Sequence, residues 1–278
     1  MDAGAIRIGG QLSERALEVL AGRRLPVTPR DAATVMLLRP ADPGLEVYML
    51  RRKSSMAFAP GAFVFPGGSV DARDADLEIA WAGPDPATWG QIFEVSPELA
   101  CALVCAAVRE TFEESGVLLA GPSPDSVVAD TTGADWEEDR HALLDRSLSL
   151  AEMLARRGLV LRSDLLRPWS RWITPVVEER RFDARFFAAA LPHQQRTRDV
   201  GGEAAEVAWV RPDDAIAAGR RQEIVLWPPT AVTLAELAAC ADVSAALRPR
   251  KVRPLLPEAF VAEGAAWLTL PDDLDYPL

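Results

Sequence analysis

The chain is poor in lysine and in long apolar runs. Only Lys53 and Lys251 occur among its 278 residues, and the net charge is −11. A nucleic-acid-binding surface needs clustered lysine and arginine, so this balance argues against a nucleic-acid partner. No apolar run reaches the ~20 residues that a membrane-spanning helix needs, so we expect no membrane segment.

Cysteine is also scarce, which argues against a disulfide framework. Cys101 and Cys105 lie four residues apart in an apolar stretch, Cys240 is remote from both, and no Cys-x-x-Cys spacing suggests zinc. Residues 1–24 lack a basic leader followed by an apolar core, so we expect no signal peptide. These features predict a cytoplasmic protein with reduced thiols.

Strand and turn patterns predict an α/β (α+β) chain with an extension at each end of one main domain. We assign residues 1–28 to an N-terminal helical extension, 29–219 to the main domain and 220–278 to a helical, proline-rich extension. The main domain should open with a hairpin of two strands. An insertion at about residues 72–98 is rich in aspartate, glycine and proline, which predicts a surface loop with a short helix around 77–81.

An acidic cluster at the end of a predicted helix (98–115) is the feature that most needs an explanation. Glu110, Glu113 and Glu114 share one helical face, where like charges repel, and lie where the helix dipole disfavours anions. Gly116 is the predicted helix stop. A divalent cation would offset both costs, and hard Mg²⁺ or Mn²⁺ prefers carboxylate oxygens. The cluster therefore predicts a metal site.

Two segments upstream are candidates for substrate contact. Gly67 and Gly68 follow a proline and predict a tight turn in which the backbone approaches a ligand. Arg51 and Arg52 belong to a basic cluster at the end of a predicted strand. They are candidates for a phosphate contact, and the alternative interpretation is a solvated strand end.

Together these segments resemble the Nudix box, Gly-x5-Glu-x7-Arg-Glu-U-x-Glu-Glu-x-Gly-U, in which U is apolar. Residues 109–117 match the arginine, glutamate and glycine positions of the second half in order, and Gly68 matches the opening glycine. Asp74 falls on the first glutamate, and the spacer to Arg109 is much longer than in the usual box. A long insertion at this point resembles the peroxisomal coenzyme A diphosphatase subgroup, as do segments such as Trp-Ile-Thr-Pro at 172–175.

The resemblance spans roughly residues 34–239 and implies the Nudix fold, a mixed β-sheet sandwiched between α-helices. It implies hydrolysis of a nucleoside diphosphate linked to another group. The three glutamates would hold Mg²⁺ or Mn²⁺, with the backbone of Gly68 close to the metal. Arg109 would fork onto a carboxylate, for which Asp74 is the candidate partner.

The general base is open between a box glutamate and a distal one. The distal candidates are glutamates in predicted loops or at strand ends: Glu178, Glu179, Glu203 and Glu206. Glu203 follows Gly201-Gly202, the most turn-like segment, and is our preferred extra ligand or base.

Three functions remain open from the sequence. The first is a diphosphatase of coenzyme A or acyl-CoA, which would release 3′,5′-ADP and a phosphopantetheine. The second is the same chemistry on ADP-ribose or NADH, and the third is a nucleotide-sensing module without catalysis. Retention of all three box glutamates favours an enzyme. We expect a small CoA-like nucleotide as the partner, and a homodimer is one hypothesis for the assembly.

Overall fold

The computed structural model describes the chain apart from residues 1–5, 55–58, 77, 200–203, 272–273 and 275. Its main sheet has eight strands, six of them in the order β11-β3-β2-β10-β9-β12, with β4 and β5 added to β3 and β2. The central pair, β2 and β10, is parallel, and β3, β9 and β11 join antiparallel. The bounds are β2 Arg30–Pro40, β3 Leu45–Arg52, β4 Phe63–Val64, β5 Gly67–Ser69, β9 Arg167–Ile173, β10 Phe182–Ala190, β11 Ala204–Val210 and β12 Pro254–Leu255.

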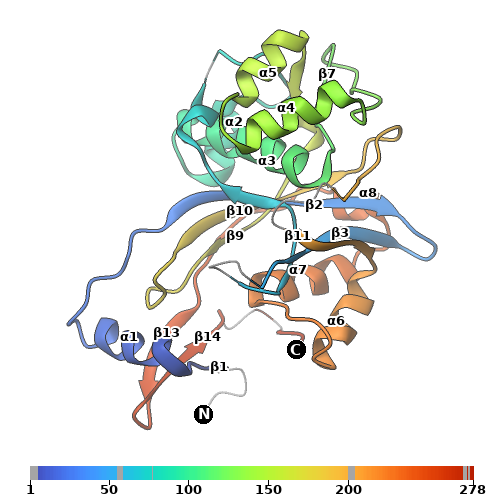
Figure 1. The fold of residues 1–278 in the computed structure, drawn as a ribbon. Coiled ribbons are helices and arrows are strands. Elements are labelled where there is room, and N and C mark those ends of the chain that lie inside the picture. The colour runs from blue at the N-terminus through green and yellow to red at the C-terminus, as the bar shows by residue number, and fades with distance from the viewer. Residues whose placement is uncertain (1–5, 55–58, 77, 200–203, 272–273, 275) are drawn as a thin grey trace.

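Helices cover both faces of this sheet because its central strands are apolar on both faces. In β2, Val35 and Leu37 join one core, whereas Met36 and Leu38 join the other, and all four are fully buried. Figure 1 shows α2 to α5 on one side of the sheet and α6 and α7 on the other. Their bounds are α2 Pro86–Phe93, α3 Pro97–Ser115, α4 Ala134–Leu144, α5 Leu150–Arg157, α6 Pro212–Arg220 and α7 Pro228–Ala238. The predicted sandwich of helices around a mixed sheet is confirmed.

The longest helix, α3, follows the predicted limits closely. Ser96 caps its first turn by accepting a hydrogen bond from the Leu99 N–H, and Gly116 ends it with a φ of 74°. Among the residues that the structure describes, no single helix is long and apolar enough to cross a membrane. Only α2 and α3 together reach that composition, and they meet at a bend of 95°.

The insertion is not a surface loop, and the helix expected at 77–81 is wrong. The segment contains a 3-10 turn, η1 (Ala72–Ala75), a short strand, β6 (Trp81–Ala82), and α2. In α2, Trp89 and Phe93 are buried and pack on Phe187 of β10, with ring centroids 5.6 and 5.3 Å away. The residues that predicted a loop supply the start of this helix: Asp85 caps it and Pro86 takes its first position.

The remaining strands form two small sheets away from the main one. One joins β6 to β8 (Val160–Arg162) and β7 (Ala120–Gly121). The other joins β1 (Ile6–Arg7), β14 (Ala265–Thr269) and β13 (Glu258–Ala262), and α1 (Gly10–Leu20) packs on it.

The C-terminal part holds more strands than its composition predicted. Its helices α7 and α8 (Val243–Ala246) pack on the main sheet. The hairpin of β13 and β14 follows them, and its turn uses Glu263 and Gly264, both with positive φ. Short strands next to prolines left a weak sequence pattern, so this hairpin was missed.

Candidate active site

The two halves of the acidic motif lie side by side despite the insertion between them. The Gly67 N–H donates a hydrogen bond of 2.8 Å to the Glu114 carboxylate. A Cβ atom on Gly68 would lie 2.6 Å from the Glu110 carboxyl carbon, so any larger residue would force this carboxylate to move. The predicted proximity of the glycine pair to the glutamates is confirmed.

The expectation that Gly67 and Gly68 form a tight turn is wrong. Gly67–Ser69 is the strand β5, antiparallel to β2, with Gly68 opposite Ala33 and Gly67 opposite Thr34. A Cβ atom on Gly67 would lie 2.8 Å from the Thr34 Cα. Both glycines therefore allow close packing of an extended backbone between β2 and α3.

Arg109 binds Asp74 through a two-pronged ion pair, as predicted. Its Nε donates to one oxygen at 3.0 Å and its Nη2 to the other at 2.9 Å. Nη1 donates to Glu110 at 2.8 Å and to Glu113 at 3.3 Å, and Nη2 also reaches the Ser69 carbonyl oxygen at 3.0 Å. Burial alone lowers the pKa of Arg109, but these hydrogen bonds and the carboxylate charges outweigh it and raise that pKa above its ordinary value. The guanidinium stays charged at the centre of the site.

Asp74 can replace the longer glutamate of the usual box because the turn η1 brings the Asp74 backbone close to Arg109. Asp71 caps this turn by accepting from the Arg73 N–H, and Asp74 accepts from the Asp71 N–H at 2.8 Å. Asp74 is 3 % exposed. The inserted segment therefore begins with a turn that aims this carboxylate at Arg109.

The site carries more negative than positive charge. Burial raises the pKa of Glu110 to about 7; Arg109 acts against this rise, and Glu113 adds to it. Burial also raises the pKa of Glu113, again opposed by Arg109. With Asp74, three carboxyl groups contact one guanidinium, and Glu114 adds a fourth carboxyl group in the same turn of α3, so a further cation would stabilise their charged forms.

The chemistry of these donors fits a hard divalent cation. The donors are buried or half-buried carboxylate oxygens beside a glycine backbone. Among the described residues, no group of three or more His, Cys, Asp or Glu side chains is already arranged around a common metal position. Glu110 and Glu113 are turned onto Arg109, and Glu114 is turned onto Gly67.

The other predicted site residues lie in different surroundings. Arg51 pairs at 3.7 Å with Glu206 across β3 and β11, and both side chains are half-exposed. Arg52 ends β3, and its N–H donates to the Ala62 carbonyl oxygen. Glu203 lies outside the described residues.

Two more of the distal glutamates lie near α1 rather than α3. Arg15 of α1 donates to the Glu178 carbonyl oxygen and pairs with Glu179 at 3.7 Å. Burial raises the pKa of Glu178. We therefore find no support for either residue as the general base.

Tyr48 of β3 borders the site, close enough to Glu114 to feel its charge, and was not predicted from the sequence. It is fully buried and donates a hydrogen bond of 3.2 Å to the Arg198 carbonyl oxygen. Burial, followed by the charges of Asp199 and Glu114, raises its pKa. A tyrosine within the apolar stretch 47–50 is a weak signal in the sequence. Its polar neighbours, Glu114 and Arg198, lie 66 and 150 residues further along the chain.

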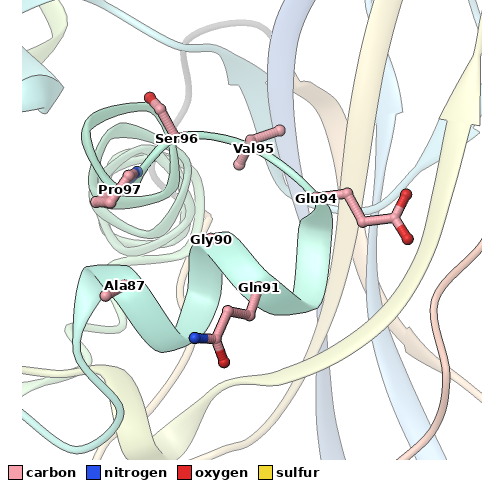
Figure 2. A pocket seen from close by; sticks show the side chains of 7 residues that line it. All are labelled: Ala87, Gly90, Gln91, Glu94, Val95, Ser96 and Pro97. Atoms are coloured by element: carbon pink, nitrogen blue, oxygen red, sulfur yellow. The ribbon is translucent and has the colours of Figure 1, made fainter.

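A surface depression of about 500 Å³ lies elsewhere, at the junction of α2 and α3. Figure 2 shows its lining, Ala87, Gly90, Gln91, Glu94, Val95, Ser96 and Pro97. An α-helix rises about 1.5 Å per residue, which puts Pro97 roughly 20 Å from Glu110 along α3. The depression is therefore separate from the carboxylates.

The relatives found by comparison with known proteins are Nudix proteins. The family model of the NUDT19 Nudix domain matches residues 87–237. An acyl-coenzyme A diphosphatase NUDT19 from Gallus gallus is 30% identical over 262 residues, covering 75% of this chain and 68% of that protein. The Xenopus laevis protein of the same name is 27% identical over 236 residues, covering 72% of this chain and 61% of its own length, which is less than two thirds.

The fold has a solved counterpart. A Nudix hydrolase from Alicyclobacillus acidocaldarius superposes with a TM-score of 0.68 at 27% identity, covering 81% of this chain and 98% of that one. The likeness therefore extends over most of both chains.

Proposed function

The chain belongs to the NUDT19 Nudix domain family, and from that premise we propose that it hydrolyses the pyrophosphate bond of coenzyme A or acyl-CoA. The observation that supports this most directly is the cluster at the end of α3. There Glu110 and Glu114 meet the backbone of β5, and Glu113 contacts Arg109 of the Arg109–Asp74 ion pair. Buried carboxylates in excess over cations suit a site that handles a pyrophosphate through a metal.

We propose that the cation is Mg²⁺ or Mn²⁺, held by the three glutamates with the Gly68 backbone beside them. Such a cation neutralises pyrophosphate oxygens and acidifies a water molecule. The chain itself supplies the oxygen donors and a glycine surface with no side chain in the way. The extended backbone of β5 lets these donors gather without a collision at Gly68.

Arg109 serves this proposal as a positioning residue rather than a phosphate ligand. Nε, Nη1 and Nη2 all donate to Asp74, Glu110, Glu113 or the Ser69 carbonyl oxygen. A guanidinium with its fork engaged in this way holds the glutamates and the inserted turn in one arrangement.

The choice of coenzyme A rests on the relatives from Gallus gallus and Xenopus laevis, which are both named acyl-coenzyme A diphosphatases. The expected products are 3′,5′-ADP and a phosphopantetheine. The test is to incubate the purified protein with CoA, acyl-CoA, NADH, ADP-ribose and dinucleoside polyphosphates, with Mg²⁺ or with EDTA, and to resolve the products by chromatography.

Each outcome of this panel has a clear meaning. Metal-dependent cleavage of CoA or acyl-CoA ahead of the other compounds would support the proposal. Preferred cleavage of ADP-ribose or NADH would keep the chemistry and overturn the substrate. Tight binding of one nucleotide without turnover of any would instead favour a sensing module.

A further inference from the structure

The last turn of α3 is held by two arginines from distant parts of the chain. A helix leaves its final carbonyl groups without partners inside the helix. Nη1 of Arg140, on α4, donates to the Glu113 carbonyl oxygen at 3.0 Å. The backbone N–H of Arg198 donates to the Ser115 carbonyl oxygen at 3.1 Å. Both bonds are made within the turn that carries Glu113 and Glu114.

Glu137 joins these two arginines to each other. Arg140 Nε donates to both oxygens of Glu137 at 3.1 Å, and Arg198 Nη1 pairs with Glu137 at 3.2 Å. Arg198 Nη2 also donates to the Thr131 carbonyl oxygen at 3.0 Å. Arg140 is 1 % exposed, whereas Arg198 and Glu137 are partly exposed, so this connection is anchored in the core at Arg140 and reaches solvent at Glu137.

Segment 191–199, which carries Arg198, is itself firmly attached. Its Gln195 side chain exchanges two hydrogen bonds of 2.8 Å with the backbone of Leu118, directly after α3. A Cβ atom on Gly116 would lie 2.6 Å from Arg198 Nε, so the glycine that ends the helix also makes room for this side chain. The end of α3, α4 and segment 191–199 therefore meet at one point.

Positive charge at the C-terminus of α3 offsets the unfavourable interaction between the helix dipole and the glutamates of its last turn. Cations near the C-terminus of a helix are stabilised by its dipole, whereas anions there are destabilised. Glu113 and Glu114 are anions in that turn. Arg140 and Arg198 place their guanidinium groups beside the same turn.

We propose that Glu137, Arg140 and Arg198 form a positioning clamp that fixes the last turn of α3, so that the affinity of its glutamates for a divalent cation depends on these three residues. The statement about the cation rests on the proposed function, whereas the statement about the helix turn does not. None of the three residues is placed in contact with substrate.

Two variants weaken the clamp without removing its volume. Glu137→Gln keeps the shape of a side chain that is one third exposed but removes the charge that joins the two arginines. Arg140→Lys keeps the charge but loses the planar fork, so it cannot reach Glu113 and both Glu137 oxygens together.

Arg156→Gln is the matched control. Arg156, on α5, pairs with Asp139 of α4, the helix that carries Glu137 and Arg140, and this pair does not involve α3. Its substitution therefore removes one ion pair between α4 and α5 and leaves the clamp intact.

The experiment measures Mn²⁺ binding by electron paramagnetic resonance and hydrogen exchange of the peptide covering residues 113–117 in all four proteins. We expect Glu137→Gln and Arg140→Lys to bind Mn²⁺ about tenfold more weakly, the usual effect of losing a residue that orients metal ligands. The peptide should exchange about tenfold faster, as when one charge-assisted hydrogen bond is lost. Arg156→Gln should match the wild type in both.

Wild-type values in both clamp variants would overturn the clamp, as would an equal loss in Arg156→Gln, because packing of α4 would then be the cause. If the wild type bound no Mn²⁺, the metal part of the proposed function would fail. Hydrogen exchange would then decide alone: faster exchange in the clamp variants supports the clamp, and unchanged exchange overturns it.

Discussion

Asp74→Asn tests whether the inserted turn holds the site together through Arg109. Asp74 is 3 % exposed, and its carboxylate accepts two hydrogen bonds from Arg109. The substitution keeps the shape of the side chain but removes the charge of this carboxylate. Breaking a buried ion pair costs about 3–5 kcal/mol because the remaining charge is left uncompensated. Arg109 keeps Glu110, Glu113 and the Ser69 carbonyl oxygen as partners, so we expect the lower end, about 3 kcal/mol.

The assay is urea unfolding, supported by thermal melts. A loss of about 3 kcal/mol corresponds to a fall of roughly 6–12 °C in melting temperature for a chain of this size. Asp71→Asn is the control, since Asp71 pairs with the more exposed Arg73 at 3.0 Å, and such pairs contribute under about 1 kcal/mol. Equal, small losses in the two variants would refute the idea that the Asp74–Arg109 pair organises the site.

Three further predictions concern the same half of the molecule. Glu110 has a pKa raised from 4.5 to about 7, so its neutral form is favoured in the folded metal-free protein and stability should fall as pH rises from about 4.5 to 7. Melting temperatures of the wild type and of Glu110→Gln, both measured in EDTA as a function of pH, should diverge across that pH window. Parallel curves would contradict the raised pKa of Glu110. Gly68→Ala should lower stability by about 1–3 kcal/mol and weaken activity, because its Cβ collides with Glu110. Gly9→Ala, which meets nothing within 4 Å, is the control, and similar losses in both would dismiss the collision. Trp89→Ala should cost about 3–5 kcal/mol in urea unfolding because this ring is buried against β10, and a loss below 1 kcal/mol would mean that the insertion is not part of the core.

Features encoded by neighbouring residues were predictable from the sequence. The hairpin of β2 and β3 follows from two largely apolar runs on either side of a turn, and the end of α3 follows from Gly116. The pairing of Arg109 with Asp74 could be anticipated only through the resemblance to the Nudix box, because nothing local links residues so far apart.

Features that depend on distant partners could not be predicted. Trp89 gives α2 a place in the core only because Phe187 faces it from β10. Arg51 was a candidate for a phosphate contact, and only the register of β3 and β11 reveals that Glu206 lies beside it. The role of Arg140 depends on how α4 packs against the end of α3, which no pattern within α4 reveals.

The most direct measurement of the central claim is CoA turnover with Mg²⁺ by the wild type, Glu114→Gln and Glu98→Gln. Glu98 makes a matched control because it is an exposed glutamate at the start of the same helix. The account predicts release of 3′,5′-ADP by the wild type and Glu98→Gln, and a loss of about 100-fold or more in Glu114→Gln, as expected when a metal-ligating group is removed. Equal turnover by all three proteins would contradict the account, and the glutamates of α3 would not be the site of hydrolysis.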